Sequence, residues 1–126
     1  MSKKTIHGVL LDTESRTIRE TVIEDSLDSF YEHLHCNAID IVTRKIGGEY
    51  VDIVCDDEAL IKENPVLAAV DEEFSPALFN SLFICGLADE EGELTSLTPE
   101  AARAVMDSIC YTMRKDGLHP CVVVAE

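Results

Sequence analysis

The alternation of hydrophobic and polar residues predicts two β-hairpins in the first half of the chain. Each consists of two runs separated by turn residues, a pattern typical of antiparallel strands joined by a short loop. The alternation is loose in the second run of the first hairpin, so it does not define the register there. The four predicted strands are Lys4–Leu11, Thr17–Ile23, Ala38–Ile46 and Glu49–Cys55. The second hairpin turns at Gly47-Gly48. Because Asp40 and Asp52 lie opposite the apolar residues of their strands, we expect it to have one face in water.

Two stretches with apolar residues at every third or fourth position predict helices. The first begins at Ser26, which can accept a hydrogen bond as an N-cap, and Asn37 can end it in a left-handed conformation. Its apolar face consists of Leu27, Phe30, Tyr31 and Leu34. We therefore expect a short helix that packs on a sheet.

The second predicted helix begins at Thr98, which acts as the N-cap before Pro99 in the first helical position. Its apolar face runs through Ala102, Val105, Met106, Ile109 and Met113. Arg114 and Lys115 would then lie in the last turn, and Gly117 would cap the helix.

Two further apolar runs predict buried strands. The run from Leu82 to Leu87 is too short for a buried helix and predicts a central strand, and Pro120–Ala125 predicts a final strand between two neighbours. The segment Asp56–Asn80 is predicted to be a long, acidic, partly ordered connection that Asn64-Pro65 interrupts. The pattern as a whole predicts an α+β fold: one domain over residues 1–126, with a mostly antiparallel sheet of about five or six strands and two helices packed on one face.

The charge is strongly negative and uneven. The formal net charge is −15, and between Ile46 and Ala102 there are 14 acids against one base, Lys62. Such a field repels nucleic acid and anionic membranes and attracts basic protein surfaces, although a strong charge can also serve only to keep a small protein in solution. No apolar run approaches the length of a membrane span, and the N-terminus lacks the apolar stretch of a signal peptide, so a cytoplasmic location is expected.

The acids gather in three runs that we expect to form a binding surface for a basic protein. This surface consists of Asp56, Asp57, Glu58, Asp71, Glu72, Glu73, Asp89, Glu90, Glu91 and Glu93. Carboxylates on such a surface can take the place of nucleic-acid phosphates on a basic partner. An unpaired edge strand would also allow a homodimer.

No arrangement of residues indicates catalysis, a metal or a cofactor. His33 and His35 are two residues apart, so on a helix they point away from each other and cannot bind one metal ion together. The acidic run at Asp89 does not fit a calcium-binding loop, and no motif for phosphate binding or nucleophilic catalysis is present. The five cysteines form no CxxC pair and are expected to be small buried residues.

An alternative function uses a pocket instead of the acidic surface. A small-molecule-binding or hydrolytic site could lie between the Asn64–Pro76 loop and the Ser81–Ala88 strand, with Asn64 and Pro65 at the pocket. Acids clustered on one exposed face would favour protein binding. Polar side chains that converge in a deep pocket, with Asn64 or a histidine at its floor, would favour the alternative.

The chain also resembles a known family in the order of its features. The matching pieces are NPVLAA from Asn64, SLFICGLADEEGELTSL from Ser81 and LTPE at the start of the second helix. They resemble the domain of unknown function numbered thirty-eight forty-six, which is found largely in phages and mobile elements of bacteria. Asn80-Ser81 departs from the family pattern, which has a glycine at the start of the late strand, and the tail HPCVVVAE is an addition.

The resemblance implies a phage or mobile-element accessory protein in a bacterial cytoplasm, and it carries no catalytic residues. Together with the charge, it makes a non-enzymatic protein that contacts a host protein the leading hypothesis.

Overall fold

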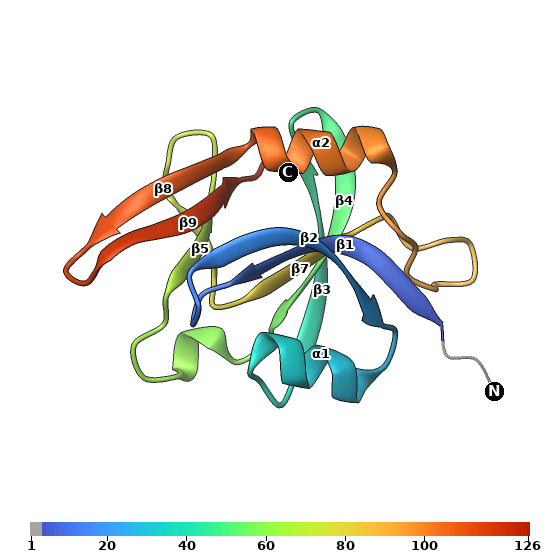
Figure 1. Cartoon of the computed structure of the whole chain (residues 1–126), viewed down its shortest axis with the longest axis horizontal. Helices are drawn as coiled ribbons and strands as arrows, with labels where there is room; N and C mark the ends of the chain where they lie inside the picture. Colours follow the sequence, from blue (N-terminus) through green and yellow to red (C-terminus); the bar gives the residue numbers. More distant parts are fainter. Residues whose placement is uncertain (1–3) are drawn as a thin grey trace.

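Two antiparallel hairpins and a short central strand form the first sheet of the computed structural model, which describes residues 4–126 (Figure 1). The hairpins consist of β1 (Thr5–Asp12) with β2 (Thr17–Glu24), and β3 (Ile39–Ile46) with β4 (Glu49–Asp56). Strand β7 (Leu82–Cys85) lies between β1 and β4 and is completely buried, which gives the strand order β2-β1-β7-β4-β3. Both predicted hairpins and the predicted central strand are therefore confirmed.

A second sheet contains four strands in the order β6-β5-β9-β8. These strands are β5 (Leu67–Val70), β6 (Pro76–Phe79), β8 (Ile109–Arg114) and β9 (Gly117–Val123). Strand β9 lies between β5, to which it is parallel, and β8, so the prediction of an internal C-terminal strand is confirmed. The predicted mostly antiparallel fold with two helices is confirmed, and the first sheet has five strands. The described residues form nine strands in two sheets, however, and not a single sheet.

The connection Asp56–Asn80 is more regular than predicted. It contains the short 3₁₀ helix η1 (Ala59–Ile61) and the strands β5 and β6. Strand β5 has only four residues and pairs with β9, which is far away along the chain. A strand of this kind has too little local pattern to be distinguished from a loop.

The two helices, α1 (Leu27–Leu34) and α2 (Pro99–Asp107), pack on opposite faces of the first sheet (Figure 1). Side chains alternate along β7, so Phe83 faces α1 and Ile84 faces the side of α2. The rings of Phe30 in α1 and Phe83 lie 6.2 Å apart between centroids. The expectation that both helices pack on one face is therefore not met. No helix within residues 4–126 has the length and apolar character needed to cross a membrane.

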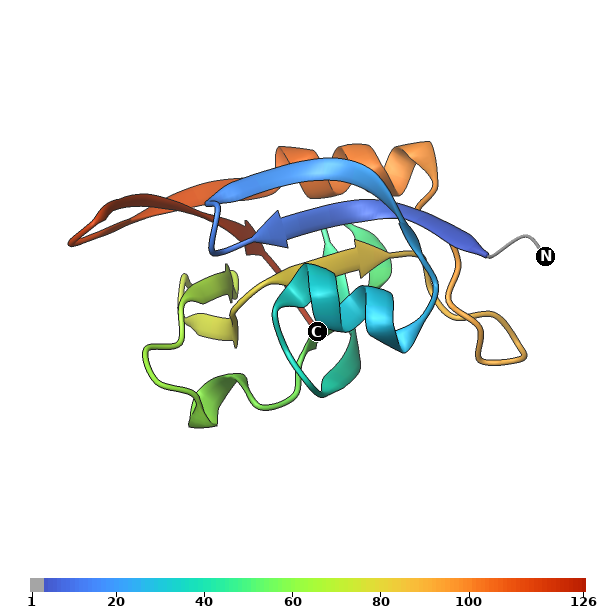
Figure 2. The same cartoon turned by 60° about the horizontal axis from the view of Figure 1, so that its bottom comes forward.

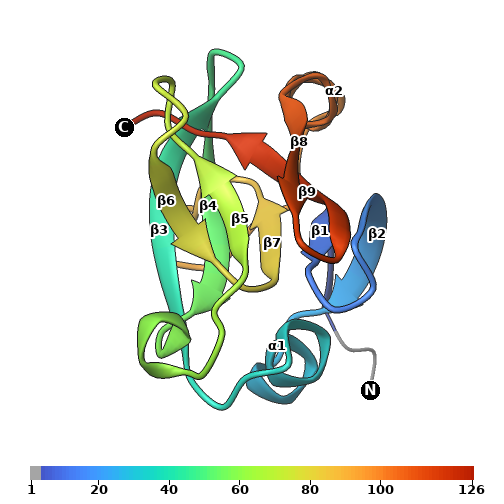
Figure 3. The same ribbon diagram turned by 90° about the vertical axis from the view of Figure 1, so that its left-hand side faces the viewer.

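The second sheet covers the same face of the first sheet as α2 does (Figure 3). Ala69 of β5 and Val122 of β9 belong to one buried cluster with Ile53 and with Val105 of α2. The first sheet is thus covered on both faces. Asp52, predicted to face water, is only 4% exposed, because the chain after β7 lies against it: its carboxylate accepts hydrogen bonds from the Ala88 amide and from the Thr43 hydroxyl.

Helix α2 begins as predicted and ends earlier than predicted. The Thr98 hydroxyl accepts a hydrogen bond of 3.1 Å from the Ala101 amide, which confirms the N-cap. The helix ends at Ser108, and the next residues form β8, in which Met113 is 74% exposed. Residues 109–112 (Ile-Cys-Tyr-Thr) include β-branched and aromatic residues, which favour a strand. Hydrogen bonding of β8 to β9 stabilises the strand more than the apolar spacing of this segment stabilises a helix. Gly117, with φ of 118°, therefore begins β9 directly after the β8–β9 turn and does not cap a helix.

Helix α1 ends in a left-handed residue, which is His35 and not the predicted Asn37. Its φ of 55° and ψ of 48° let the Cys36 amide bond back to the Tyr31 carbonyl. This cap places the His35 imidazole against the β1–β2 turn, where its nitrogens lie 3.4 Å from the Asp12 carboxylate and 3.3 Å from the Glu14 carboxylate.

The cysteines are mostly buried, as predicted. Cys36, Cys55, Cys85 and Cys121 are buried and Cys110 is half-buried, all as free thiols. Burial raises the pKa of the Cys55 thiol to about 11 and that of the Cys85 thiol to about 12.

Candidate functional site

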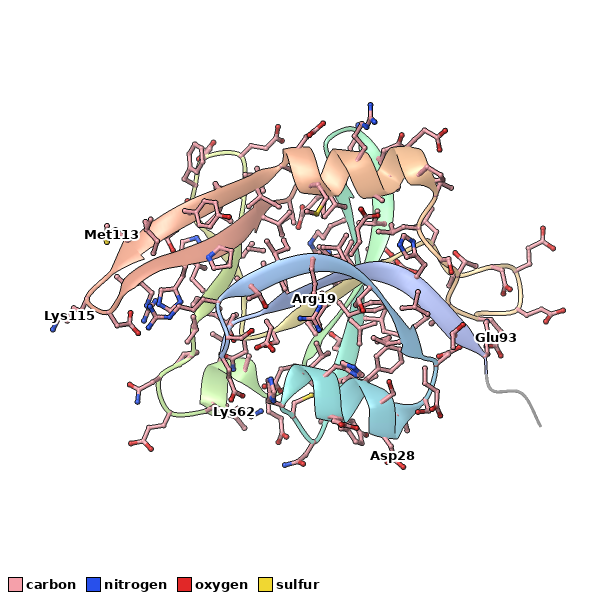
Figure 4. All side chains as sticks on the ribbon, in the orientation of Figure 1. Arg19, Asp28, Lys62, Glu93, Met113 and Lys115 are labelled. Carbon is pink, nitrogen blue, oxygen red and sulfur yellow. The ribbon has the colours of Figure 1, made fainter. Side chains whose placement is uncertain are left out.

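The three acidic runs lie at separate ends of the molecule (Figures 1 and 2). The first follows β4 and leads into η1, the second forms the β5–β6 turn, and the third lies in the long loop between β7 and α2. Figure 4 shows that the first and third regions are well separated: Lys62, which follows η1, and Glu93 of the third run lie on different sides of the molecule. The acids that the sequence grouped into one surface are therefore not brought together on one face.

An aspartate at the start of each acidic run holds the backbone of its own turn. The Asp71 carboxylate accepts hydrogen bonds from the amides of Glu73 and Ser75, both at 2.9 Å. The Asp89 carboxylate accepts from Glu91 and Glu93 at 2.9 and 3.0 Å. Such side-chain bonds stabilise turns, so these two acids have a structural role whatever the surface binds.

Asp56 does not belong to the acidic surface. It is 6% exposed, its Oδ1 accepts a hydrogen bond from the Glu58 amide, and its Oδ2 pairs with the Lys62 ammonium group. Its charge is therefore balanced inside the protein. Sequence position alone could not separate it from the exposed Asp57 beside it.

An apolar groove lies between η1 and β6, with β3 and β4 at its base. Its volume is about 210 Å³, and its apolar lining includes Leu60, Ile61 and Phe79. Leu60 is 73% and Ile61 81% exposed, so two adjacent large aliphatic side chains of the groove lie in contact with solvent. The charged residues that line it are all acids: the buried Asp56 and, nearer to solvent, Asp40, Asp57 and Glu58. We call this feature the acidic-rimmed groove.

A second hollow, here called the polar cleft, forms where five connecting segments meet. They are the β1–β2 turn, the end of α1, the η1–β5 link, the β6–β7 link and the β8–β9 turn. Its volume is about 320 Å³. Asn64, one of the two residues predicted at a pocket, lines this cleft, whereas Pro65 is not among its lining residues in the described part of the chain.

Buried hydroxyl groups and a buried histidine line the polar cleft. Ser81 is 1% exposed, and its hydroxyl accepts a hydrogen bond of 3.0 Å from the Thr13 amide and lies 3.2 Å from the Thr13 hydroxyl. His119 is 4% exposed, and its Nε2 lies 2.9 Å from a carboxylate oxygen of Asp116. Its Nδ1 is buried and has no partner among residues 4–126.

Ion pairs connect the segments around the polar cleft. The Arg16 guanidinium donates to the carbonyl and to the carboxylate of Asp116, both at 2.6 Å, and so joins the β1–β2 turn to the β8–β9 turn. The hydrogen bond from His119, assisted by the nearby Arg16 charge, lowers the pKa of the Asp116 carboxyl below its ordinary value. Burial acts to raise the pKa of Asp12, but the amides of Ser15 and Glu14 and the His35 imidazole together lower it.

Sequence reasoning missed most of the residues that line the polar cleft. His119, Ser81, Thr13 and Arg16 come from segments that are distant in sequence, and no motif connects them. The left-handed cap that positions His35 also has no clear sequence signal, because Asn37 is the better residue for that conformation. Among residues 4–126 there is no group of three or more histidine, cysteine or acidic side chains that could hold a metal ion.

Comparison with protein families gives one match. A family described as a domain of unknown function, DUF3846, matches residues 6–109, which include the first sheet, both helices and the segments that line the acidic-rimmed groove. The match ends at the first residue of β8, so the tail that departs from the resemblance lies outside it. Curated proteins and solved structures gave no match. The chain therefore belongs to the DUF3846 family of domains of unknown function.

Proposed function

We propose that this protein is a non-enzymatic binding protein that contacts a basic partner protein through the acidic-rimmed groove. The observation that carries the proposal is the combination of two exposed aliphatic side chains, Leu60 and Ile61, with a rim that contains acids and no lysine or arginine. A partner segment that fits this combination presents apolar side chains flanked by lysine or arginine, as an amphipathic basic helix does.

The apolar part of the groove provides affinity. Each square ångström of apolar surface removed from water contributes about 25 cal/mol. Leu60 and Ile61 are largely exposed, and exposed apolar patches with polar rims mark interaction sites.

The acids provide steering and selectivity. Asp57 and Glu58 lie next to η1, and Asp40 borders the groove from β3. Opposite charges across an interface accelerate encounter and penalise wrong partners more than they add to affinity. The runs at Asp71–Glu73 and Asp89–Glu93 lie in other loops, away from the groove. They attract a basic partner at long range but do not contact it.

The biological setting is part of the proposal. A bacterial host protein that meets a phage or mobile-element product is the partner class that the family resemblance supports. The negative charge supports a basic protein over nucleic acid or an anionic membrane as the partner.

The proposal is tested by binding of two model peptides that differ only in charge. One is a fluorescent amphipathic peptide of leucine and lysine, and the other has glutamate in place of lysine. We expect the lysine peptide to bind in a saturable manner, with affinity that falls as salt is added, and the glutamate peptide not to bind. Fluorescence anisotropy measures both.

Two charge-reversal variants separate the groove from the overall charge. Asp57→Lys with Glu58→Lys changes the rim, and Glu90→Lys with Glu91→Lys makes the same change in net charge on the remote loop. We expect the rim variant to bind the lysine peptide about tenfold more weakly than the loop variant. Equal affinities of the two variants would show attraction by net charge alone and would contradict the groove as the binding site.

A further inference from the structure

The polar cleft is lined by two bases, Arg16 and Lys62, and by three acids, and the hollow beside it adds further positive charge. It shares Asn64, Val66, Asp116 and His119 with an adjoining hollow at the β8–β9 hairpin. Together the two hollows are lined by four of the chain's ten basic residues, which are Arg16, Lys62, Arg114 and Lys115. Figure 4 shows Lys62 below this region and Lys115 at the end of the hairpin.

Two other hollows in the described residues have more acids than bases. The acidic-rimmed groove has four acids and no base, and a wide depression near the C-terminus has Arg44 against Asp71, Glu72, Glu73 and Glu126. The polar cleft with its adjoining hollow has four bases against three acids, Glu14, Glu63 and Asp116, in addition to two histidines. An anion therefore meets less repulsion here than at those two sites.

Arg16 and Lys62 have more hydrogen-bond donors than their ion pairs use. Arg16 uses two N–H donors on Asp116, and a guanidinium group has five. Lys62 pairs with Asp56, and an ammonium group has three donors. Asn80 accepts a hydrogen bond from the Val66 amide through Oδ1, which leaves its NH₂ group as a donor. An oxyanion can therefore be bound without breaking either ion pair.

The buried wall of the cleft is incomplete within the chain. The His119 Nε2 donates to Asp116, so the Nδ1 of the neutral imidazole is a buried acceptor without a partner, and atoms of this kind are paired by water or a ligand in native proteins. The donors for an oxyanion belong to Arg16, Lys62 and Asn80, which come from three different connecting segments. Donors that approach from several directions suit the three free oxygens of a phosphate group better than a planar carboxylate.

We propose that the polar cleft binds a small phosphorylated molecule, with Arg16 and Lys62 as its cationic contacts. The volume of about 320 Å³ lies at the lower end for ligand pockets, so the ligand is no larger than about a mononucleotide. This site is separate from the acidic-rimmed groove, and its occupancy does not depend on the partner proposed there.

The test is a titration of the full chain with defined probes, followed by calorimetry and by amide chemical shifts. The probes are inorganic phosphate, a nucleoside monophosphate, the same nucleoside without phosphate, and succinate. We expect saturable binding of the nucleoside monophosphate, with shifts at Ser81 and His119, and no binding of the free nucleoside. Binding of the free nucleoside or of succinate with equal affinity, or no binding of either phosphate probe, would overturn the assignment.

Arg16→Gln is the main variant and Arg103→Gln is its matched control. Both remove one positive charge, but Arg103 lies exposed on α2, away from the cleft. We expect affinity for the nucleoside monophosphate to fall about tenfold in the Arg16 variant and to stay unchanged in the control. Equal losses would overturn the proposal. Lys62→Gln is a second variant. Because Lys62 also balances the charge of the buried Asp56, circular dichroism must first show that this variant is folded before its affinity is compared.

Discussion

At the scale of single residues, side chains of one type have different roles according to where they lie. Asp56 is buried and paired with Lys62, Asp71 and Asp89 hold their turns, and Asp57 is free to face a partner. The sequence groups these residues by charge. Only the fold shows that a carboxylate used by backbone amides or by a buried lysine contributes less to an interaction surface.

The cysteines give a prediction at the same scale. Burial raises the pKa of all five thiols, Cys85 and Cys55 most of all, so little reactive thiolate is present at mildly alkaline pH. We expect iodoacetamide to label the native protein slowly and first at Cys110, the least buried. Peptide mass spectrometry after brief labelling identifies the site. Early labelling of Cys85 would contradict the buried position of β7.

At the scale of elements, the boundary between α2 and β8 is the largest departure from the sequence pattern, and a pair of substitutions tests it. Met113 is 74% exposed on β8, so Met113→Lys should change the free energy of unfolding by no more than about 0.5 kcal/mol. Val105 is completely buried in α2, so Val105→Ala should cost about 2 kcal/mol. Urea denaturation measures both. A loss of several kcal/mol for Met113→Lys would support the longer helix that the pattern predicts.

The elements that could be predicted are those with strong local signals. The two hairpins have turn residues between alternating runs, and α2 begins with Thr98-Pro99, so their positions follow from the sequence. The missed strands β5, β6 and β8 are short or share their apolar spacing with a helix. Strand β6 pairs with β5 and β8 pairs with β9 in hairpins, whereas β5 pairs with the distant β9, and long-range pairing of that kind has no local signature.

The candidate sites were predictable only in part, for the same reason. Asn64 was expected at a pocket, and it lines the polar cleft. The histidine that lies buried beside it, His119, comes from the opposite end of the chain. The acidic-rimmed groove depends on β6 lying next to η1, and neither element was predicted.

At the scale of the whole molecule, charge and shape divide the surface into regions with different partners. The net charge is −15, and one of the three acidic runs borders an apolar groove, while four bases line the polar cleft and its adjoining hollow. The two proposed sites therefore differ in the charge of their ligands: a basic protein binds at the acidic-rimmed groove, and a small anion binds at the polar cleft.

The most direct test of the groove is to map the amide chemical shifts of the labelled protein as the leucine-lysine peptide is added. The account predicts saturable shifts centred on Leu60, Ile61 and Phe79, with the remote loop at Glu90 and Glu91 unchanged. Shifts spread equally over all three acidic runs, or centred on the β5–β6 turn or the Asp89–Glu93 loop, would contradict the groove as the contact site. Such a result would mean that the negative charge attracts basic molecules in general, without a specific contact site.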